Sequence, residues 1–114
     1  MSDCLFCKMV SGAIKPDIVF ETSNILAFRD IHPCAPMHAL VIPKRHIETI
    51  NDLNPEDAGL TGEMLLAAKT VAQQDGIAQS GYRTVMNCNL DAGQSVFHIH
   101  LHVLGGRVLS WPPG

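Results

Sequence analysis

The stretch Phe97–Val103, with the sequence FHIHLHV, places a histidine at every second position of a hydrophobic run. Side chains of a β-strand alternate between its two faces, so a strand here presents His98, His100 and His102 on one face. The apolar residues between them, Phe97 included, are then expected to face the core. One strand face would carry three groups that titrate near neutral pH and can transfer protons, attack phosphorus or bind metal.

Four further stretches that precede this one predict strands. Two β-prone runs, Ile18–Glu21 and Ile25–Asp30, flank polar turn residues and indicate a hairpin. A third strand is expected over His38–Ile42, stopped by Pro43, and a fourth over Tyr82–Asn87.

Helix signals lie at two places in the chain. The segment Cys4–Ser11 predicts a short helical turn ended by Gly12. A longer helix is expected to begin with Asn54 as its cap and Pro55 in its first turn, and to stop at Gly76. One apolar helix face is formed by Leu60, Met64, Ala67 and Val71. Strands joined by short turns around these helices favour an α+β fold, an antiparallel sheet with helices on one face.

Length and composition limit the class of protein. The 114 residues suit a single domain spanning 1–114, and 46% hydrophobic residues can build a core. The net charge of −3 argues against a nucleic-acid strand as partner, although one nucleotide remains compatible. No apolar run approaches the ~18 residues needed to cross a membrane. The N-terminus lacks a signal-peptide pattern, so we expect a cytoplasmic protein with reduced thiols.

Three interpretations of the alternating histidines compete. A plain surface strand is improbable for three histidines in strict alternation. A single metal ion explains at most two of them, because the first and third lie ~13 Å apart along a strand. Nucleophilic attack on phosphorus uses them all, with the central His100 as nucleophile. The preceding loop, Gly93-Gln94-Ser95, would supply backbone N–H groups and a hydroxyl where charge develops.

The histidine stretch and its surroundings resemble a known family. Residues Gly93–Arg107 resemble the signature of the histidine triad (HIT) superfamily, and the ending Gly105–Gly114 is similar to that of its Hint branch. The resemblance covers nearly the whole chain, since further segments fit as well: Phe28–Ile31, Pro36–Lys44 and Gly81–Arg83.

The resemblance implies a fold, an activity and a partner. Hint proteins are homodimers in which two five-stranded antiparallel sheets, each with two helices, join into a ten-stranded sheet. They hydrolyse the P–N bond of purine nucleoside phosphoramidates. For this chain the resemblance implies an adenylyl-His100 intermediate, release of AMP, and chemistry that needs no metal. The alternatives are a dinucleoside polyphosphate hydrolase and a nucleotide-binding or scaffold protein with incidental hydrolysis.

The resemblance also implies roles for individual residues. His38 and His102 would flank His100 and bind phosphoryl oxygens, the carbonyl of His98 would fix the His100 tautomer, and Ser95 would contact the leaving nitrogen. The remaining residues implied in binding the purine nucleotide are Phe6, Phe28 and Ile31 around the base, Asp30 on the ribose, and Asn87, Gly93 and Gln94 near the phosphate. Trp111 would reach the partner subunit's site and influence specificity there. The three apolar residues could equally be core packing, Asp30 a turn residue, and Trp111 interface packing.

A pair of cysteines, Cys4 and Cys7, has the spacing of a zinc site. A closed structural site needs two more ligands, for which His46 and His98 are the candidates. Similar sets hold zinc in some bacterial relatives. Two thiols packed in a helical turn, or a zinc-dependent structural module without catalysis, are the alternatives. Cys34 and Cys88 lie outside any motif and are expected to be small apolar side chains.

Overall fold

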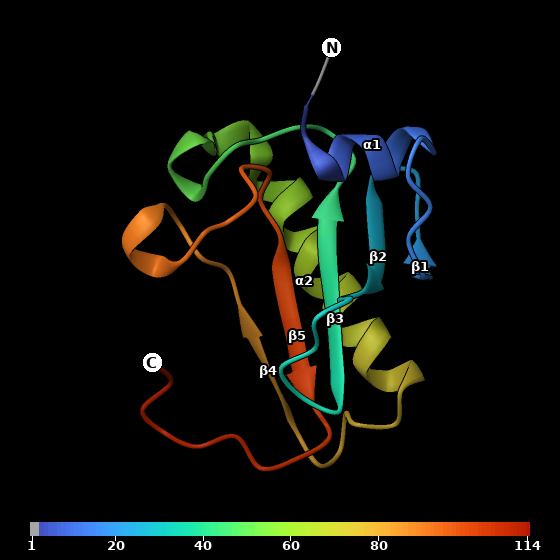
Figure 1. Ribbon diagram of the computed structural model, residues 1–114, viewed down its shortest axis with the longest axis vertical. Helices are drawn as coiled ribbons and strands as arrows, with labels where there is room; N and C mark the ends of the chain where they lie inside the picture. Colours follow the sequence, from blue (N-terminus) through green and yellow to red (C-terminus); the bar gives the residue numbers. More distant parts are fainter. Residues whose placement is uncertain (1–2) are drawn as a thin grey trace.

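The computed structural model describes residues 3–114 and shows an α+β fold built on one sheet (Figure 1). The sheet has five strands in the order β1-β2-β3-β5-β4, and every neighbouring pair is antiparallel. The elements are α1 (Leu5–Ser11), β1 (Ile18–Glu21), β2 (Ile25–Arg29), β3 (Met37–Pro43), α2 (Ala58–Gln74), β4 (Tyr82–Val85) and β5 (Leu101–Gly105). The predicted fold class, a five-stranded antiparallel sheet with two helices, is confirmed.

The two helices cover opposite faces of the sheet, so the expectation of helices on one face is wrong. Alternate residues of β2 and β3 pack into two separate clusters. One cluster packs against α2 and contains Met64 and Val71, and the other packs against Phe6 of α1. Strand β3 is buried along its whole length. A strand that is apolar on both faces needs a packing layer on each side, which the two helices provide.

Strand β3 runs one residue past the predicted stop. Pro43 is its last residue and pairs in register with Ile25 of β2. A proline lacks the N–H that a ladder needs, but at a strand terminus this loss is tolerated. The carbonyl of Pro43 is used instead by the side chain of His98, 2.7 Å away.

The histidine strand is shorter than predicted. β5 begins at Leu101, so His98 and His100 lie in the segment that leads into it. The ladder between β3 and β5 ends at the pair Val41–Leu101, so this segment lies outside it, and Ile99 N–H donates instead to Ile47 O at 2.7 Å. The alternation nevertheless persists, since Ile99 is buried against the α2 cluster. The prediction that Phe97 faces the core is wrong, because this side chain is 44% exposed.

The long helix begins in two steps. A 3-10 turn, Pro55–Asp57, comes first, and the side chains of Asn54 and Asp57 form a capping box around it. Helix α2 proper starts at Ala58, so the predicted cap begins the helical segment but not the α-helix. Gly76, with a positive φ of 74°, follows the helix end as predicted. No helix within residues 3–114 is long and apolar enough to cross a membrane.

An ion pair connects β2 to the end of α2. Arg29 donates through both terminal nitrogens to the carboxylate of Asp75, and the second of these bonds measures 2.8 Å. The guanidinium, chiefly through these hydrogen bonds, lowers the pKa of Asp75 below its ordinary value. The pair therefore stabilises the fold above the ordinary pKa of the carboxyl and ceases to do so as the pH falls through the lowered pKa.

Replacing Asp75 by asparagine is expected to lower the free energy of unfolding by about 1 kcal/mol at pH 7, because the pair is only partly buried. The difference from the wild type should shrink as the pH falls below about 4. Urea unfolding of the variant and the wild type, at pH 7 and below about pH 4, measures this difference in the free energy of unfolding. The exposed Glu56→Gln serves as control, and an equal loss at all pH values would contradict the assignment.

Candidate active site and metal centre

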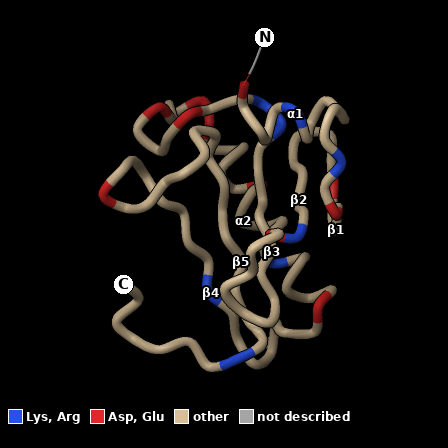
Figure 2. The backbone as a smooth tube through the Cα atoms, viewed as in Figure 1, with Lys and Arg blue, Asp and Glu red and all other residues tan. Residues whose placement is uncertain are grey.

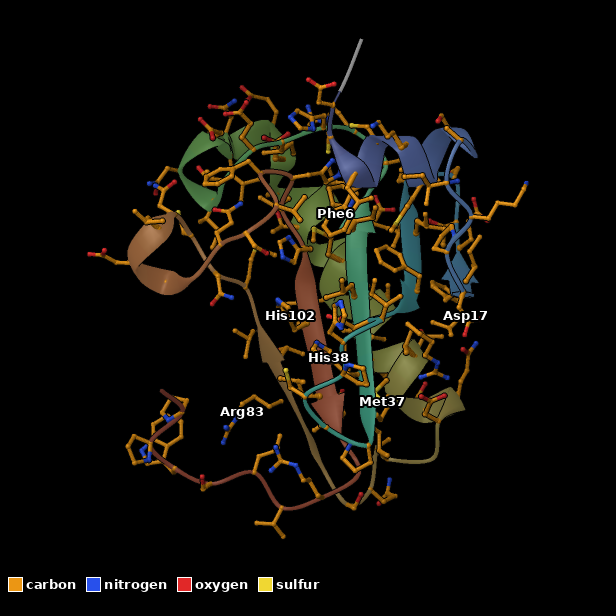
Figure 3. The ribbon with its side chains drawn as sticks, viewed as in Figure 1. Phe6, Asp17, Met37, His38, Arg83 and His102 are labelled. Atoms are coloured by element: carbon orange, nitrogen blue, oxygen red, sulfur yellow. The ribbon has the colours of Figure 1, made fainter. Side chains whose placement is uncertain are left out.

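Four histidines follow one another across the face of the sheet that α1 covers. His38 on β3 lies beside His102 on the neighbouring β5 (Figure 3), with His38 Nε2 2.9 Å from His102 Nδ1. The rings of His102 and His100 have centroids 5.1 Å apart, and the ring of Phe6 packs edge-on against His100. The face therefore brings His98, His100 and His102 together with His38, which stands sixty-odd positions earlier in the chain.

The hydrogen bonds of His100 define its chemistry. Its Nδ1 lies 2.8 Å from the carbonyl oxygen of His98, and a carbonyl can only accept, so Nδ1 carries the proton. The Nε2 atom then holds a lone pair, which is the form a nucleophile requires. Burial lowers the pKa of His100, so the neutral imidazole is favoured.

His38 and His102 are also held in the neutral form. Burial lowers the pKa of His38, and the nearby Asp30 carboxylate, 3.4 Å from His38 Nε2, opposes this only in part. Burial, and then the neighbouring imidazoles of His100 and His38, lower the pKa of His102 to about 4. At neutral pH both rings can donate one hydrogen bond and accept one.

We expect no protonation of His102 between pH 8 and pH 5, measured by NMR titration of its imidazole protons. A pKa lowered from an ordinary value of about 6.5 contributes stability that is present above pH 6.5 and is lost as the pH falls toward about 4. Wild-type stability should therefore fall more steeply over this window than that of His102→Gln. An NMR midpoint near 6.5 would contradict the prediction.

The loop before the histidines is held from inside by Gln94. Its buried amide accepts from Asn89 N–H at 2.8 Å and donates to the carbonyls of Glu48 and Val96 at 2.7 and 3.1 Å. These bonds use both amide hydrogens and the amide oxygen, so this side chain shapes the loop. Gly93, with φ of 87°, makes the turn there, and the exposed Ser95 presents its hydroxyl at the loop surface.

The apolar residues expected around a base divide into two groups. Phe6 and Phe28 are buried and pack edge-on with centroids 5.6 Å apart, so both belong to the core beneath α1. Phe6 also forms a wall of the site through its contacts with His98 and His100. Ile31, by contrast, is 85% exposed at the edge of the site.

Two other expected binding residues lie toward the far edge of the sheet. Asn87 is half-buried just beyond the end of β4. Trp111 is 79% exposed, and the guanidinium of Arg83 lies 5.9 Å from the centre of its ring. Trp111 therefore lies beside β4, and its role at the partner subunit's site stays a prediction.

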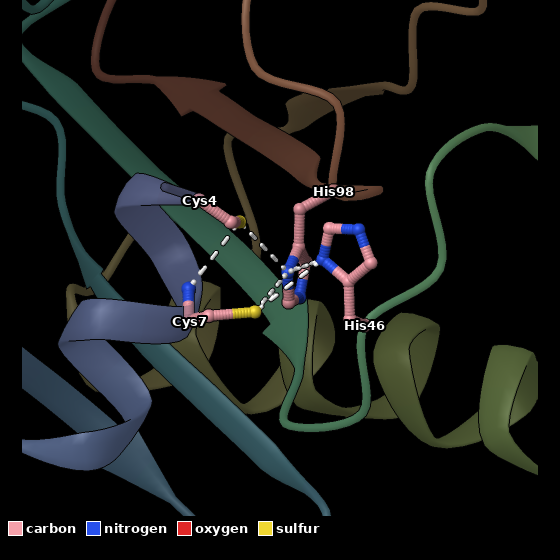
Figure 4. Close-up of side chains that lie close together, drawn as sticks. All are labelled: Cys4, Cys7, His46 and His98. Carbon is pink, nitrogen blue, oxygen red and sulfur yellow. Dashed lines mark hydrogen bonds between the residues drawn. The ribbon is translucent and has the colours of Figure 1, made fainter. Parts of the chain in front are cut away.

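The two cysteines of α1 meet two histidines at the end of the sheet (Figure 4). His98 Nδ1 lies 3.4 Å from Cys4 Sγ and 3.6 Å from Cys7 Sγ. His46 Nδ1 lies 3.3 Å from Cys7 Sγ and 3.2 Å from His98 Nδ1. One potential ligand atom from each residue therefore points to a common centre.

These distances fit a tetrahedral zinc ion. Bonds of about 2.3 Å to sulfur and about 2.05 Å to nitrogen put the ligand atoms of a tetrahedron about 3.3 Å apart for two nitrogens and about 3.5 Å for sulfur and nitrogen. His98 is in the required tautomer, since its Nε2 lies 2.7 Å from Pro43 O and must donate, which leaves a lone pair on Nδ1.

Comparisons with known proteins identify the family of the chain. The family model for the scavenger mRNA decapping enzyme C-terminal binding domain matches residues 3–110. A HIT-like protein of Synechococcus elongatus is 47% identical over 98% of this chain and 97% of its own length. The purine nucleoside phosphoramidase of Escherichia coli is 46% identical over 94% of this chain and 90% of its own length.

A solved structure with the same fold was found as well. The crystal structure of a HIT family hydrolase from Legionella pneumophila superposes with a TM-score of 0.96 at 56% identity, covering 98% of this chain and 100% of that one. The chain therefore belongs to the histidine triad superfamily and is a Hint-like member of it.

Proposed function

We propose that this chain is a purine nucleoside phosphoramidase that hydrolyses adenosine 5′-phosphoramidates to AMP and an amine. The observation that carries the proposal is the 2.8 Å contact between His100 Nδ1 and the carbonyl of His98, which leaves the Nε2 lone pair available. The similarity to the E. coli enzyme named for this activity supports the choice of substrate class. Lys and Arg residues are dispersed along the backbone (Figure 2), which suits a single nucleotide better than a nucleic-acid strand.

The proposed reaction has two steps. His100 Nε2 attacks the α-phosphorus, a P–N bond to His100 forms, and the P–N bond to the amine breaks as the leaving nitrogen takes a proton from solvent. Water then attacks the same phosphorus, returns a proton to solvent, releases His100 and gives AMP. The N–H of His102 and the hydroxyl of Ser95 would donate to phosphoryl oxygen and leaving nitrogen, where charge develops. The chain's own donors suffice for this chemistry.

The nucleotide would extend from His100 toward the loop that follows β2. Asp30 would accept hydrogen bonds from the two ribose hydroxyls, because a carboxylate can accept from adjacent donors. Ile31 would cover the base, with Phe6 and Phe28 beneath it. Asn87 and the backbone at Gly93 and Gln94 would approach the phosphate from the other side.

A structural zinc ion is part of the proposal. Cys4, Cys7, His46 and His98 would hold it, on the distances given above. The ion would tie α1 to the segment that carries His98. No step of the reaction passes through it.

We also propose that the active form is a homodimer with a continuous ten-stranded sheet. β4 is an edge strand of the sheet and offers unpaired backbone groups to a second copy. Leu65 and Leu66, both more than half exposed on α2, and the exposed Trp111 would be covered by the partner. Sedimentation velocity should give twice the 12.4 kDa chain mass, and a monomer at micromolar concentration would contradict this.

Turnover of two substrates tests the activity. We expect faster hydrolysis of adenosine 5′-phosphoramidate than of diadenosine polyphosphates, measured as kcat/KM for each. The reverse preference would indicate a dinucleoside polyphosphate hydrolase of the same superfamily. Tight AMP binding without turnover of either substrate would indicate a nucleotide-binding protein.

A further inference from the structure

The loop between β2 and β3 contacts the histidine face through its backbone. The N–H of Cys34 donates to Nδ1 of His38 at 3.0 Å. The carbonyl of the same residue accepts from Nη2 of Arg107 at 3.1 Å. Arg107 follows the end of β5 by two positions. The backbone of Cys34 is therefore held between His38 on β3 and Arg107, which follows β5.

These contacts determine where the protons lie. Because Nδ1 of His38 accepts from the Cys34 N–H, the proton of the neutral ring must be on Nε2. That Nε2–H lies 2.9 Å from Nδ1 of His102 and donates to it. Nδ1 of His102 is then an acceptor, and the proton of His102 must also be on Nε2. A single backbone N–H thus determines the tautomers of two rings.

The hydrogen bond between His38 and His102 and the 3.4 Å contact between Asp30 and His38 Nε2 hold Asp30, His38 and His102 close together. Their side-chain atoms lie within 4.8 Å of one another, near enough for a metal. A metal at this point would need a lone pair on His38 Nε2, which would move the proton to Nδ1 and set it against the Cys34 N–H. The cluster is therefore a proton-ordering chain, unlike the cysteine–histidine cluster, where the lone pair of His98 already faces the centre.

We propose that Arg107 and the backbone amide of Cys34 are positioning groups that keep the proton of both His38 and His102 on Nε2. The proposal rests on the proposed function only for the group that accepts a hydrogen bond from His102 Nε2–H. That group would be a phosphoryl oxygen or the leaving nitrogen. In the opposite tautomer His102 would present a lone pair to the negatively charged phosphoryl group. Arg107 acts through Cys34 and does not touch the imidazoles.

Asp30 and His100 are the titratable side chains that face the pair formed by His38 and His102. Asp30 faces His38 Nε2 from the end of β2, 3.4 Å away, and its carboxylate also accepts rather than donates. His100 lies on the other side of His102, with ring centroids 5.1 Å apart. Neither group can supply a proton donor to His38 Nδ1, so the Cys34 amide has no substitute there among these residues.

Two-bond proton–nitrogen NMR spectra of the ¹⁵N-labelled full chain test the proposal. At pH 7 we expect both His38 and His102 as neutral Nε2–H tautomers. In Arg107→Ala and in Cys34→Pro, which removes the amide hydrogen, a second tautomer should appear. Cys34→Ala keeps that hydrogen and should keep the wild-type tautomers. We also expect kcat on adenosine 5′-phosphoramidate to fall about tenfold in the first two variants, the effect of one hydrogen bond, with the Kd for AMP within about twofold.

The outcomes separate this proposal from the proposed function. A wild-type spectrum with either ring protonated on Nδ1, or an Arg107→Ala variant with wild-type tautomers and kcat, would overturn it. If Cys34→Pro does not fold, Arg107→Ala and the wild-type spectrum decide alone. The tautomers are measured without substrate, so expected tautomers in a protein that releases no AMP would contradict the proposed function and support the positioning role.

Discussion

Replacing His100 by glutamine is expected to abolish single-turnover release of AMP from adenosine 5′-phosphoramidate, lowering the rate by at least about 10⁴-fold. The reason is that the lone pair of His100 Nε2 is left available by the bond between Nδ1 and a backbone carbonyl, whereas the lone pair of His98, also oriented by a backbone carbonyl, faces Cys4 and Cys7. Rapid quenching of the wild type should trap a nucleotide on the protein, and peptide mapping should locate it on His100. The same treatment of the variant should trap none.

The control for this variant is His32→Ala, which removes an exposed imidazole from the neighbouring loop and keeps the backbone N–H that donates to Asp30. It should retain wild-type rates. Thermal unfolding must show that His100→Gln is folded, since His100 is buried. A folded His100→Gln protein with full activity would show that the proposed nucleophile is wrong.

Removing zinc is expected to have the largest effect on stability. At a zinc concentration a thousandfold above the Kd, binding to the folded state alone contributes about 4 kcal/mol, which corresponds to about 15 °C in Tm for a domain of this size. A chelator, or the double substitution Cys4→Ser and Cys7→Ser, should produce this loss. Elemental analysis should find one zinc per wild-type chain and none in the double variant.

The matched control is Cys88→Ser, which alters a half-buried cysteine outside the cluster and should keep both the zinc and the wild-type Tm. AMP release measured well below the lowered Tm should persist in the chelated protein, because the proposed chemistry does not use the metal. A metal-free wild-type chain whose Tm ignores chelator would favour the alternative of two thiols packed in a helical turn.

Local patterns in the sequence were sufficient for much of the fold. The apolar spacing of α2, its stop at Gly76 and the runs that form β1 and β2 depend on neighbours a few residues apart, which a linear pattern records. The alternation of the histidines likewise survives in the structure. His98 and His100 lie outside the strand ladder, but Ile99 between them is buried, and this burial keeps the two histidines on the opposite face.

What local patterns could not show depends on residues far apart in the chain. The length of the histidine strand depends on where its ladder with β3 stops, at the pair Val41–Leu101, and the second helix layer depends on burial of β3 on both faces. The alternation predicts Phe97 as a core residue, but this side chain is 44% exposed.

The sequence by itself determined which groups carry chemistry: three alternating histidines, a cysteine pair and the loop before them. Only the tertiary structure decided how they are used. It brought His46 and His98 to the cysteines, placed His38 beside His102, and set the Cys34 amide and Arg107 behind them. Residue types are written in the chain, whereas proton positions and ligand sets depend on ångström distances between distant segments, which the packing of the sheet and its two helices creates.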